Sequence, residues 1–173
     1  MIQIYKPNAK NTGYGFSFQL GKDKYSYSLY INAIAQSSYD KQKRQGYFEG
    51  NKDNPDKNIS VKFNEFELGE MIFALTKKSE WSTIHKFAKG GGENDMTQIY
   101  IGKYERTDRK TQKKSLENTL SFIRNGNQKF GITLNDGERT CLIEFFRFCL
   151  AKIYSTRFIK NQEAFDKKEY TKN

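Results

Sequence analysis

The residues that most often perform enzyme chemistry are scarce in this chain of 173 residues. Its single histidine, His85, lies in a strand-like pattern beside Lys86, and no Ser or Cys motif of a nucleophile with its base accompanies it. A lone histidine in a strand is usually structural or a surface contact. We therefore expect no catalytic residue, and we rank an enzyme, such as a nuclease, behind the binding functions considered below.

Two cysteines offer the other possible chemistry. Cys141 and Cys149 lie eight residues apart on similar faces of one expected helix, where they cannot bridge each other. Together with one distant histidine they cannot complete a zinc site. We expect both to be small core residues in a reducing compartment, with no metal and no cofactor. The expected location is the cytoplasm of a bacterium or of a virus-infected host, with an organelle as the alternative.

The composition indicates a polyanionic partner. Lys and Arg number 30 against 20 Asp and Glu, which gives a formal net charge of +10, and 15% of the residues are aromatic. Such a chain can bind nucleic acid or an anionic membrane surface, or can simply be a soluble basic protein. No apolar run reaches the ~18 residues of a membrane span, and the amino end "MIQIYKPNAK" lacks the pattern of a signal peptide. We therefore expect no membrane partner.

Segments that interleave basic residues with aromatic rings favour nucleic acid. They read "YKPNAKNTGYGF", "KDKYSYSLY", "WSTIHKF" and "IYIGKYER". Single strands are held by this combination, because lysines neutralise the backbone while rings stack on unpaired bases at ~1–3 kcal/mol per base. The candidate nucleic-acid-binding residues are Lys6, Lys10, Tyr14, Tyr25, Tyr27, Tyr30, Trp81, His85, Lys86, Lys89, Lys103, Tyr104 and Arg106.

Alternating rings can instead form the buried face of a sheet, as they do in many β-rich cores. This alternative is the stronger one for the rings Tyr14, Phe16, Phe18, Tyr25 and Tyr27. For three other rings the two interpretations are balanced, because these rings lie at strand starts or at positions of opposite parity to their apolar neighbours. These rings are Tyr30, Trp81 and Tyr104.

One pattern occurs twice in the chain. The segment "ISVKFNEFELGEMIFAL", which begins at Ile59, is followed 71 residues later by "FGITLNDGERTCLIEFF", which begins at Phe130. In each copy, alternate apolar residues predict a strand with one buried face. An Asn follows with a Glu three residues later, which resembles a capping box, and the apolar residues then take helical spacing. Each copy therefore predicts a strand that leads directly into a capped amphipathic helix.

Further strand patterns precede each copy. "GYGFSFQL" and "KYSYSLYINAIA" predict a hairpin with "GKDK" as its turn, and "GYFEG" is a short third candidate. In the second half, "WSTIHKFA", "TQIYIGKYER" and "NTLSFIRN" precede a strand that starts at Lys129. We therefore predict an α+β fold with a duplicated ββββα unit. One domain should span residues 1–155, in halves of about 1–78 and 79–155, followed by a flexible basic tail over residues 156–173.

The second expected helix, "ERTCLIEFFRFCLAKIY", is apolar over more than one stripe. Such a helix needs apolar partners on two sides, of which one can be a second subunit. We therefore expect a homo-oligomer whose interface includes Leu142, Phe145, Phe146, Phe148 and Cys149.

This arrangement resembles the Whirly single-stranded-DNA-binding proteins, whose fold the kinetoplastid mitochondrial guide-RNA-binding proteins share. The likeness covers about Tyr14 to Tyr154 and rests on element order in "NISVKFNEFELGEMIFALTKKSEWSTIHKFAKGGGENDMTQIYIGKYE" and "ENTLSFIRNGNQKFGITLNDGERTCLIEFFRFCLAKI". It implies two packed antiparallel sheets with helices on one side and a tetramer assembled through the helices. It also implies a single strand along sheet edges between subunits, near "STIHKFAKG" and Lys103.

The chain departs from the plant Whirly pattern at the head of the first strand. Alignment on "GFSF" places Asn11, Thr12 and Gly13 where those proteins have a lysine-rich motif, with Lys6 and Lys10 earlier.

The leading hypothesis is a non-enzymatic protein that binds single-stranded DNA with little sequence preference and serves replication or recombination. The alternatives are RNA binding of Whirly or PUR-repeat type and a protein-interaction module that binds no nucleic acid.

Overall fold

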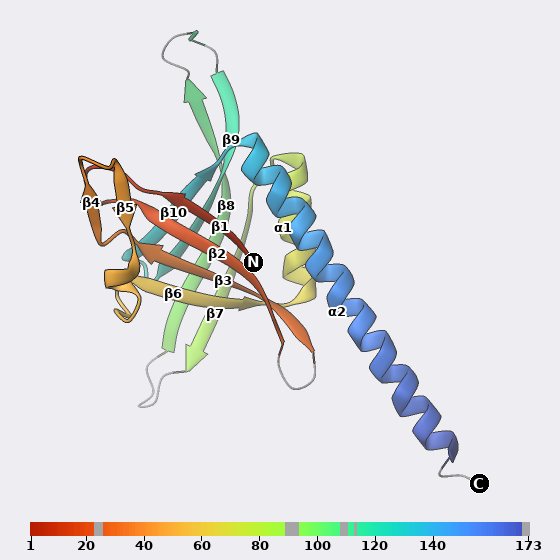
Figure 1. Cartoon of the computed structure of the whole chain (residues 1–173). Coiled ribbons are helices and arrows are strands. Elements are labelled where there is room, and N and C mark those ends of the chain that lie inside the picture. Colours follow the sequence, from red (N-terminus) through yellow and green to blue (C-terminus); the bar gives the residue numbers. More distant parts are fainter. Residues whose placement is uncertain (23–25, 89–93, 108–110, 113, 171–173) are drawn as a thin grey trace.

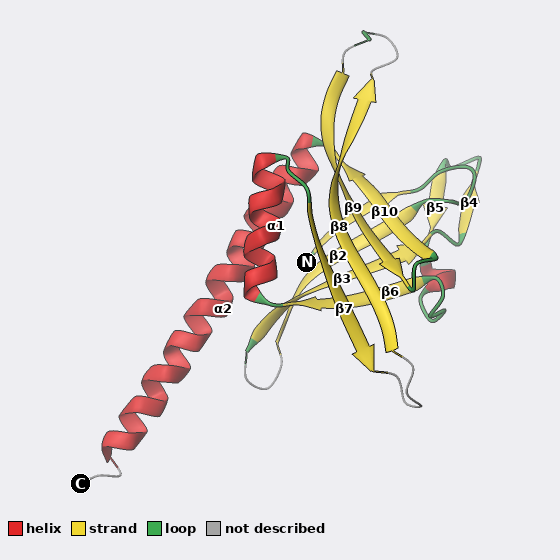
Figure 2. Cartoon of the chain, turned by 180° about the vertical axis from the view of Figure 1, so that it is seen from behind, coloured by secondary structure: helices red, strands yellow, loops and turns green. Residues whose placement is uncertain are grey.

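The computed structural model describes residues 1–22, 26–88, 94–107, 111–112 and 114–170, without the side chains of residues 88, 94 and 163–170. Two four-stranded antiparallel sheets, each followed by a helix, make up the chain (Figures 1 and 2). The first sheet contains β1 (Ile2–Lys6), β2 (Tyr14–Lys22), β3 (Tyr27–Ala35) and β6 (Asn58–Phe63), and α1 (Glu65–Lys77) follows it. The second contains β7 (Trp81–Ala88), β8 (Asn94–Thr107), β9 (Lys114–Arg124) and β10 (Gln128–Leu134), and α2 (Asp136–Tyr170) follows it.

The duplicated ββββα plan is confirmed, because each sheet is an antiparallel meander that leads into a helix. The expected hairpin of β2 and β3 is present, with Phe16 opposite Ala33. The short strand expected at "GYFEG" is present at Gly46 and Tyr47, which belong to β5 (Gln45–Tyr47), but this strand pairs with β4 (Ser38–Asp40) and is not part of the first sheet. The fourth strand of the first sheet is β1, whose apolar alternation is only Ile2 and Ile4. Two apolar positions are too few for a periodicity to be recognised.

The segment between β3 and β6 forms a separate small hairpin. Its strands β4 (Ser38–Asp40) and β5 (Gln45–Tyr47) pair only with each other among the described strands, and the single 3₁₀ turn η1 (Glu49–Asn51) follows. In Figure 1 this hairpin lies on the side of the sheets opposite the helices. The first half is therefore a four-stranded meander that carries a surface insertion.

Both predicted capping boxes are present. The Asn64 side chain accepts bonds from the backbone N–H groups of Phe66 and Glu67, and Glu67 bonds back to the Asn64 N–H. In the second copy, Asn135 Oδ1 accepts from the Glu138 N–H at 2.9 Å while Glu138 Oε2 accepts from the Asn135 N–H at 3.0 Å. The sequence repeat is therefore also a structural repeat.

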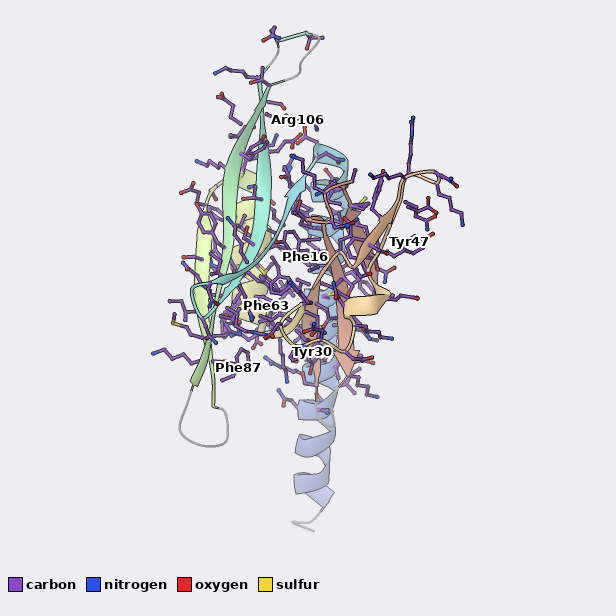
Figure 3. All side chains as sticks on the ribbon, turned by 90° about the vertical axis from the view of Figure 1, so that its left-hand side faces the viewer. Phe16, Tyr30, Tyr47, Phe63, Phe87 and Arg106 are labelled. Carbon is purple, nitrogen blue, oxygen red and sulfur yellow. The ribbon has the colours of Figure 1, made fainter. Side chains whose placement is uncertain are left out.

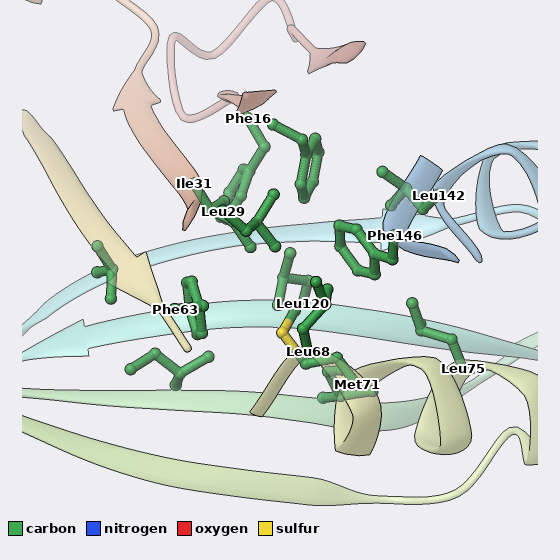
Figure 4. Packing of buried hydrophobic residues seen from close by; sticks show 14 of the residues in the cluster. Phe16, Leu29, Ile31, Phe63, Leu68, Met71, Leu75, Leu120, Leu142 and Phe146 are labelled. Carbon is green, nitrogen blue, oxygen red and sulfur yellow. The ribbon is translucent and has the colours of Figure 1, made fainter. Parts of the chain in front are cut away.

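The core lies between the two sheets and continues under the helices. Phe16 of β2 meets Phe122 of β9 edge to face with ring centroids 5.3 Å apart, and Phe63 of β6 lies 6.2 Å from the same ring. Phe18 contacts Phe146 of α2 at 5.9 Å. Figure 3 shows Phe16 and Phe63 between the layers, and Figure 4 shows how Leu68, Met71 and Leu75 of α1 close the cluster from the helix side.

Both helices lie on the same side of the sheets and pack on each other (Figure 1). The second helix is longer than the sequence pattern suggests, because α2 runs through the expected tail as far as Tyr170. Residues 151–170 contain no Gly or Pro and alternate charged with apolar side chains, which is compatible with a continuing helix. The far half of α2 projects away from the body of the chain (Figure 2).

Three of the five residues expected at an oligomer interface are in the wrong place for it. Leu142, Phe146 and Cys149 are fully buried in the chain's own core, so no second subunit can reach them. Phe145 is half-buried against that core, whereas Phe148 is 58% exposed. The expectation for the two cysteines is likewise correct only for Cys149, since Cys141 is exposed.

Candidate nucleic-acid interface

The two sheets carry more positive charge than the two helices. Their eight strands contain nine basic and three acidic residues, a net charge of +6. The two helices contain eight basic and nine acidic residues, a net charge of −1. An anionic polymer is therefore attracted to the sheet side of the molecule rather than to the helix side.

The three acidic side chains of the sheets all have polar partners. Asp95 accepts from Asn125 Nδ2 at 2.9 Å, Glu105 lies 2.7 Å from Lys114 Nζ, and Glu117 lies 3.3 Å from Arg106 Nη1. The Lys114–Glu105 pair is exposed, and exposed ion pairs are weak enough to rearrange when a phosphate approaches, whereas the Glu117 side chain is only 13% exposed. These acids therefore oppose a polyanion only weakly.

A groove beside β10 brings three of the candidate residues together. Two adjoining hollows of about 390 and 230 Å³ share Tyr14, Gly131, Ile132 and Thr133, and we call them the β10 groove. The first also contains Lys6 and Arg106, and the second contains Lys129. Residues from β1, β2, β8 and β10 thus converge where the edges of the two sheets meet.

Lys6 and Arg106 of the β10 groove form ion pairs but remain accessible to solvent. Lys6 Nζ lies 2.5 Å from Glu138 Oε1, the glutamate of the second capping box, and 36% of the Lys6 side chain is exposed. Arg106 pairs with Glu117 and is mostly exposed, and Figure 3 shows it toward the far end of β8. Tyr14 lies edge to face on Phe130 at 5.9 Å, so its ring is fixed at the groove's inner end. Hydroxyl and amide groups of Thr12, Thr119, Thr133 and Asn135 complete the lining.

Three tyrosine rings pack directly over glycines on the outer faces of the sheets. A Cβ atom on Gly15, Gly21 or Gly102 would lie 2.4–2.6 Å from a ring atom of Tyr5, Tyr30 or Tyr100 respectively. Each ring therefore lies flat across a glycine, an arrangement that also fills the space that a missing side chain leaves in a strand. Lys62 Nζ lies 5.9 Å from the centroid of the Tyr30 ring, close enough for a cation–π contact.

Tyr30 and Tyr104 occupy outer-face positions, as their parity predicted. Tyr104 lies opposite Glu117 and is 49% exposed, and Arg106 follows on the same face of β8. Nearer the other end of that face, exposed Ile84 and Met96 flank Lys86, which lies directly opposite Met96. This face thus combines rings, aliphatic groups and cations.

Trp81 and His85 lie on the other face of β7 from Ile84 and Lys86, although His85 lines a hollow together with these two residues. They lie opposite Ile101 and Thr97 on the core side of β7. Trp81 is half-buried against the core, and His85 Nε2 lies 2.7 Å from Glu67 Oε1 of the first capping box. The strand β7 was predicted correctly, and the sequence left the face of Trp81 open because the pattern "WSTIHKFA" has apolar residues on both faces.

The other candidates are dispersed. Tyr27 lies on the core side near α2, with Lys152 Nζ 5.8 Å from its ring centroid. Lys10 is exposed in the loop after β1, and Lys103 is exposed on β8 opposite Asn118. Tyr25 and Lys89 lie outside the described residues.

Four residues of the candidate interface were not predicted from the sequence. They are Tyr5 and Tyr100, which are seated on glycines, and Lys62 and Lys129, which lie on the outer faces. Burial and a hydrogen bond with Glu80 raise the pKa of Tyr100. The signal for Lys62 and Lys129 was their opposite parity to Val61, Phe63 and Phe130 in the repeated strands.

The described residues show neither a metal centre nor a membrane-spanning helix. No cluster of three or more His, Cys, Asp or Glu side chains lies within metal-binding range in the part of the chain that is described. No described helix combines the length and apolar character needed to cross a bilayer.

Two solved structures of plant proteins share this architecture. The chain is similar to the crystal structure of WHY3 from Arabidopsis thaliana, with a TM-score of 0.56 and 13% sequence identity over 92% of this chain and 91% of that one. It is also similar to the plant transcriptional regulator PBF-2, with a TM-score of 0.54 and 12% identity over 93% and 85% of the two chains. The sequence matches no protein-family model and no curated protein. The chain therefore has a Whirly-type fold, which confirms the fold that the resemblance implied.

Proposed function

We propose that this protein binds single-stranded nucleic acid, with DNA as the first candidate, on the outer faces and edges of its sheets. The observation that carries the proposal is the placement of charge, with a net +6 on eight strands and −1 on two helices. The β10 groove supplies cations for phosphates, and the outer-face rings supply stacking surfaces. The similarity to a plant transcriptional regulator is compatible with a nucleic-acid partner.

The geometry favours a single strand over a duplex. Rings that lie flat on a sheet can stack only on bases that are free of their complementary strand. A duplex is read by an element inserted into a groove, whereas the helices of this chain lie on the less basic side. Binding should depend little on sequence at the stacking positions, because every base has a π-face.

A salt titration with matched oligonucleotides tests the proposal. Fluorescence anisotropy should show tighter binding to labelled oligo-dT than to a duplex of the same length, with log K falling linearly as log salt rises. Oligo-rU in the same titration distinguishes DNA from RNA, which can differ by one 2′-OH contact. Equal or stronger affinity for the duplex would overturn the proposal.

We also propose that the protein holds the strand without cleaving it. The one histidine is engaged with Glu67, and no metal cluster occurs among the described residues. Incubation of the labelled strand with the protein and Mg²⁺ should leave the strand intact. Cleavage that copurifies with the protein would move the enzyme hypothesis to first place.

Self-association through the helices is the second part of the proposal, with a tetramer as the expected form. Large apolar side chains are exposed on the helix side, namely Phe66 and Phe73 of α1 and Phe148, Phe158 and Ile159 of α2. An exposed set of this size on helices is typical of an interface. Assembly through this side would leave the basic sheets facing outward. The alternative, a protein-interaction module, would use the same helices for a different partner.

A further inference from the structure

A hollow of about 490 Å³ lies on the outer face of the first sheet, bordered by the segment that contains Phe48 and Lys52. Its floor is a row of polar side chains that crosses four strands in register. Gln3 lies opposite Ser17, Ser17 opposite Asn32, and Asn32 opposite Ser60. A volume of this size falls in the range of small-ligand sites.

Two aromatic rings form one wall of the hollow. Tyr5 and Phe48 have ring centroids 4.9 Å apart with a tilt of 43°. Tyr5 is held flat against the sheet, since a Cβ on Gly15 would lie 2.5 Å from its ring, and it is still 45% exposed. The wall therefore offers a fixed aromatic surface next to polar groups, a combination suited to a planar heterocycle.

The charges around the hollow favour a neutral ligand. One cation, Lys52, and one anion, Glu49, lie among its lining residues. A phosphate would require a surplus of positive charge here, which the β10 groove has and this hollow lacks. An uncharged nucleobase matches the balanced charge of the lining residues better.

Hydrogen bonds attach the inserted segment that borders the hollow to the sheet without any ligand. Gln36 is buried, and its amide accepts from the Asn8 N–H at 2.9 Å and donates to the carbonyls of Asn8 and Ser38 at 3.0 and 2.9 Å. Asn51 Nδ2 donates to the Ala35 carbonyl at 3.0 Å, which secures η1. These contacts fix the inserted segment against the strands, so little ordering is needed on binding.

Asn32 is the side chain placed to read a base edge. One of its amide N–H groups donates to Ser17 Oγ at 3.3 Å, which leaves the carbonyl oxygen and the second N–H as an acceptor–donor pair. Such a pair matches the N6 donor and N7 acceptor of adenine, the base that Asn and Gln recognise most often. We propose that the hollow binds one base of the single strand, with a preference for adenine read by Asn32. This inference rests on the proposed single-strand binding and adds base selectivity at one position.

The test compares oligo-dA with oligo-dT, each of ~16 nucleotides, for the wild type and for Asn32→Ala. The substitution should lower the dA-to-dT affinity ratio at least ~5-fold, the lower end of the discrimination by one bidentate contact. Self-stacking of oligo-dA is the same for both proteins and cancels in this comparison. Gln19→Ala is the matched control, because Gln19 is an exposed amide on the same face outside the hollow, and it should leave the ratio unchanged.

Asn32→Thr provides a second variant that retains strand propensity, and it should lower the ratio in the same direction. An unchanged ratio in both variants, while oligonucleotides still bind, would overturn the adenine site and leave the proposed function standing. A protein that binds no single strand would overturn both. Oligo-rA in parallel shows whether the same hollow accepts the ribose form.

Discussion

At the residue scale, the interface depends on pairs in which a glycine makes room for a ring. Gly15, Gly21 and Gly102 are each needed because a Cβ would collide with a tyrosine ring. The sequence shows the glycines and the rings, but it does not show which lie together. Tyr5 lies directly across from Gly15, whereas Tyr100 precedes Gly102 by two residues on the same strand. Such pairings depend on strand register, which one chain's sequence leaves open.

The exposed ring of Tyr104 gives the most direct test of stacking. Tyr104→Ala should weaken oligo-dT binding by ~1–3 kcal/mol if one base stacks on it, with little effect on stability, because about half of the side chain is exposed. Tyr154→Ala is the matched control, since Tyr154 is 50% exposed but lies on α2. Anisotropy measures both affinities, and an equal loss in the two variants would contradict stacking on Tyr104.

The two thiols should differ in reactivity. Burial raises the pKa of Cys149 to about 11, so almost none of it is thiolate at pH 8, whereas Cys141 is exposed. Titration of the native protein with a thiol reagent at pH 8 should give one fast equivalent, with the second appearing only on unfolding. Cys141→Ser should remove the fast equivalent. Two equally fast equivalents would mean that the α2 core opens readily.

At the element scale, the sequence predicted what local chemistry determines. The strand-to-helix repeat, both capping boxes and seven strands of the two sheets follow from alternation, cap residues and turn signals. β1 was missed because Ile2 and Ile4 alone show the alternation, and its identity as a sheet strand comes from pairing with β2. The extension of α2 to Tyr170 was missed because its polar residues were interpreted as a flexible tail, although they include no Gly or Pro. The face of Trp81 was left open by the sequence and is determined by tertiary packing.

Ionic contacts at both ends of α1 join it to α2 and give a pH prediction. Hydrogen bonding to Arg157 of α2 lowers the pKa of Glu65 of α1, and hydrogen bonds from Lys78 and Arg139 lower that of Asp136. A carboxyl with a lowered folded-state pKa stabilises the fold above its unfolded-state pKa, and this stability is lost as pH falls through the folded value. Stability should therefore decrease below about pH 4.5, the ordinary pKa of a glutamate.

Glu65→Gln should show which part of that acid sensitivity comes from the helix contact. Urea unfolding should find the variant less stable than the wild type at pH 7, with a smaller difference at pH 3, because the wild-type carboxylate is then increasingly protonated. A difference that stays constant between the two pH values would show that the charge of Glu65 contributes nothing to helix packing.

At the scale of the whole molecule, the two sides differ in net charge. The strands of the two sheets carry +6 and the helices −1, while large apolar side chains are exposed on both sides. The amino-acid composition predicted the positive charge, but only the fold shows that the helix side is the less basic one. The proposed assembly through the helices would therefore leave the basic sheets accessible to the proposed single strand.

Helix-side substitutions should therefore reduce assembly. Phe148 and Ile159 are 58% and 57% exposed, and eleven residues of α-helix bring them to nearly the same face of α2. Light scattering should find a wild-type oligomer, tetrameric by expectation, and smaller soluble species for Phe148→Glu with Ile159→Glu. Met96→Glu, on the outer face of the second sheet, should leave the assembly intact. A monomeric wild type would contradict the self-association proposal.

A salt titration with oligo-dT on two charge-matched double variants distinguishes binding by the sheet surface from binding by net charge alone. The sheet variant is Arg106→Gln with Lys129→Gln, and the helix variant is Arg147→Gln with Lys77→Gln. Each arginine is ion-paired, to Glu117 and Glu144 respectively, and each lysine is exposed. The sheet variant should bind more weakly, with a salt slope shallower by roughly 1.4 if both cations contact phosphates, and the helix variant should behave as the wild type. Equal losses in the two variants would show that net charge, and not the sheet surface, determines binding.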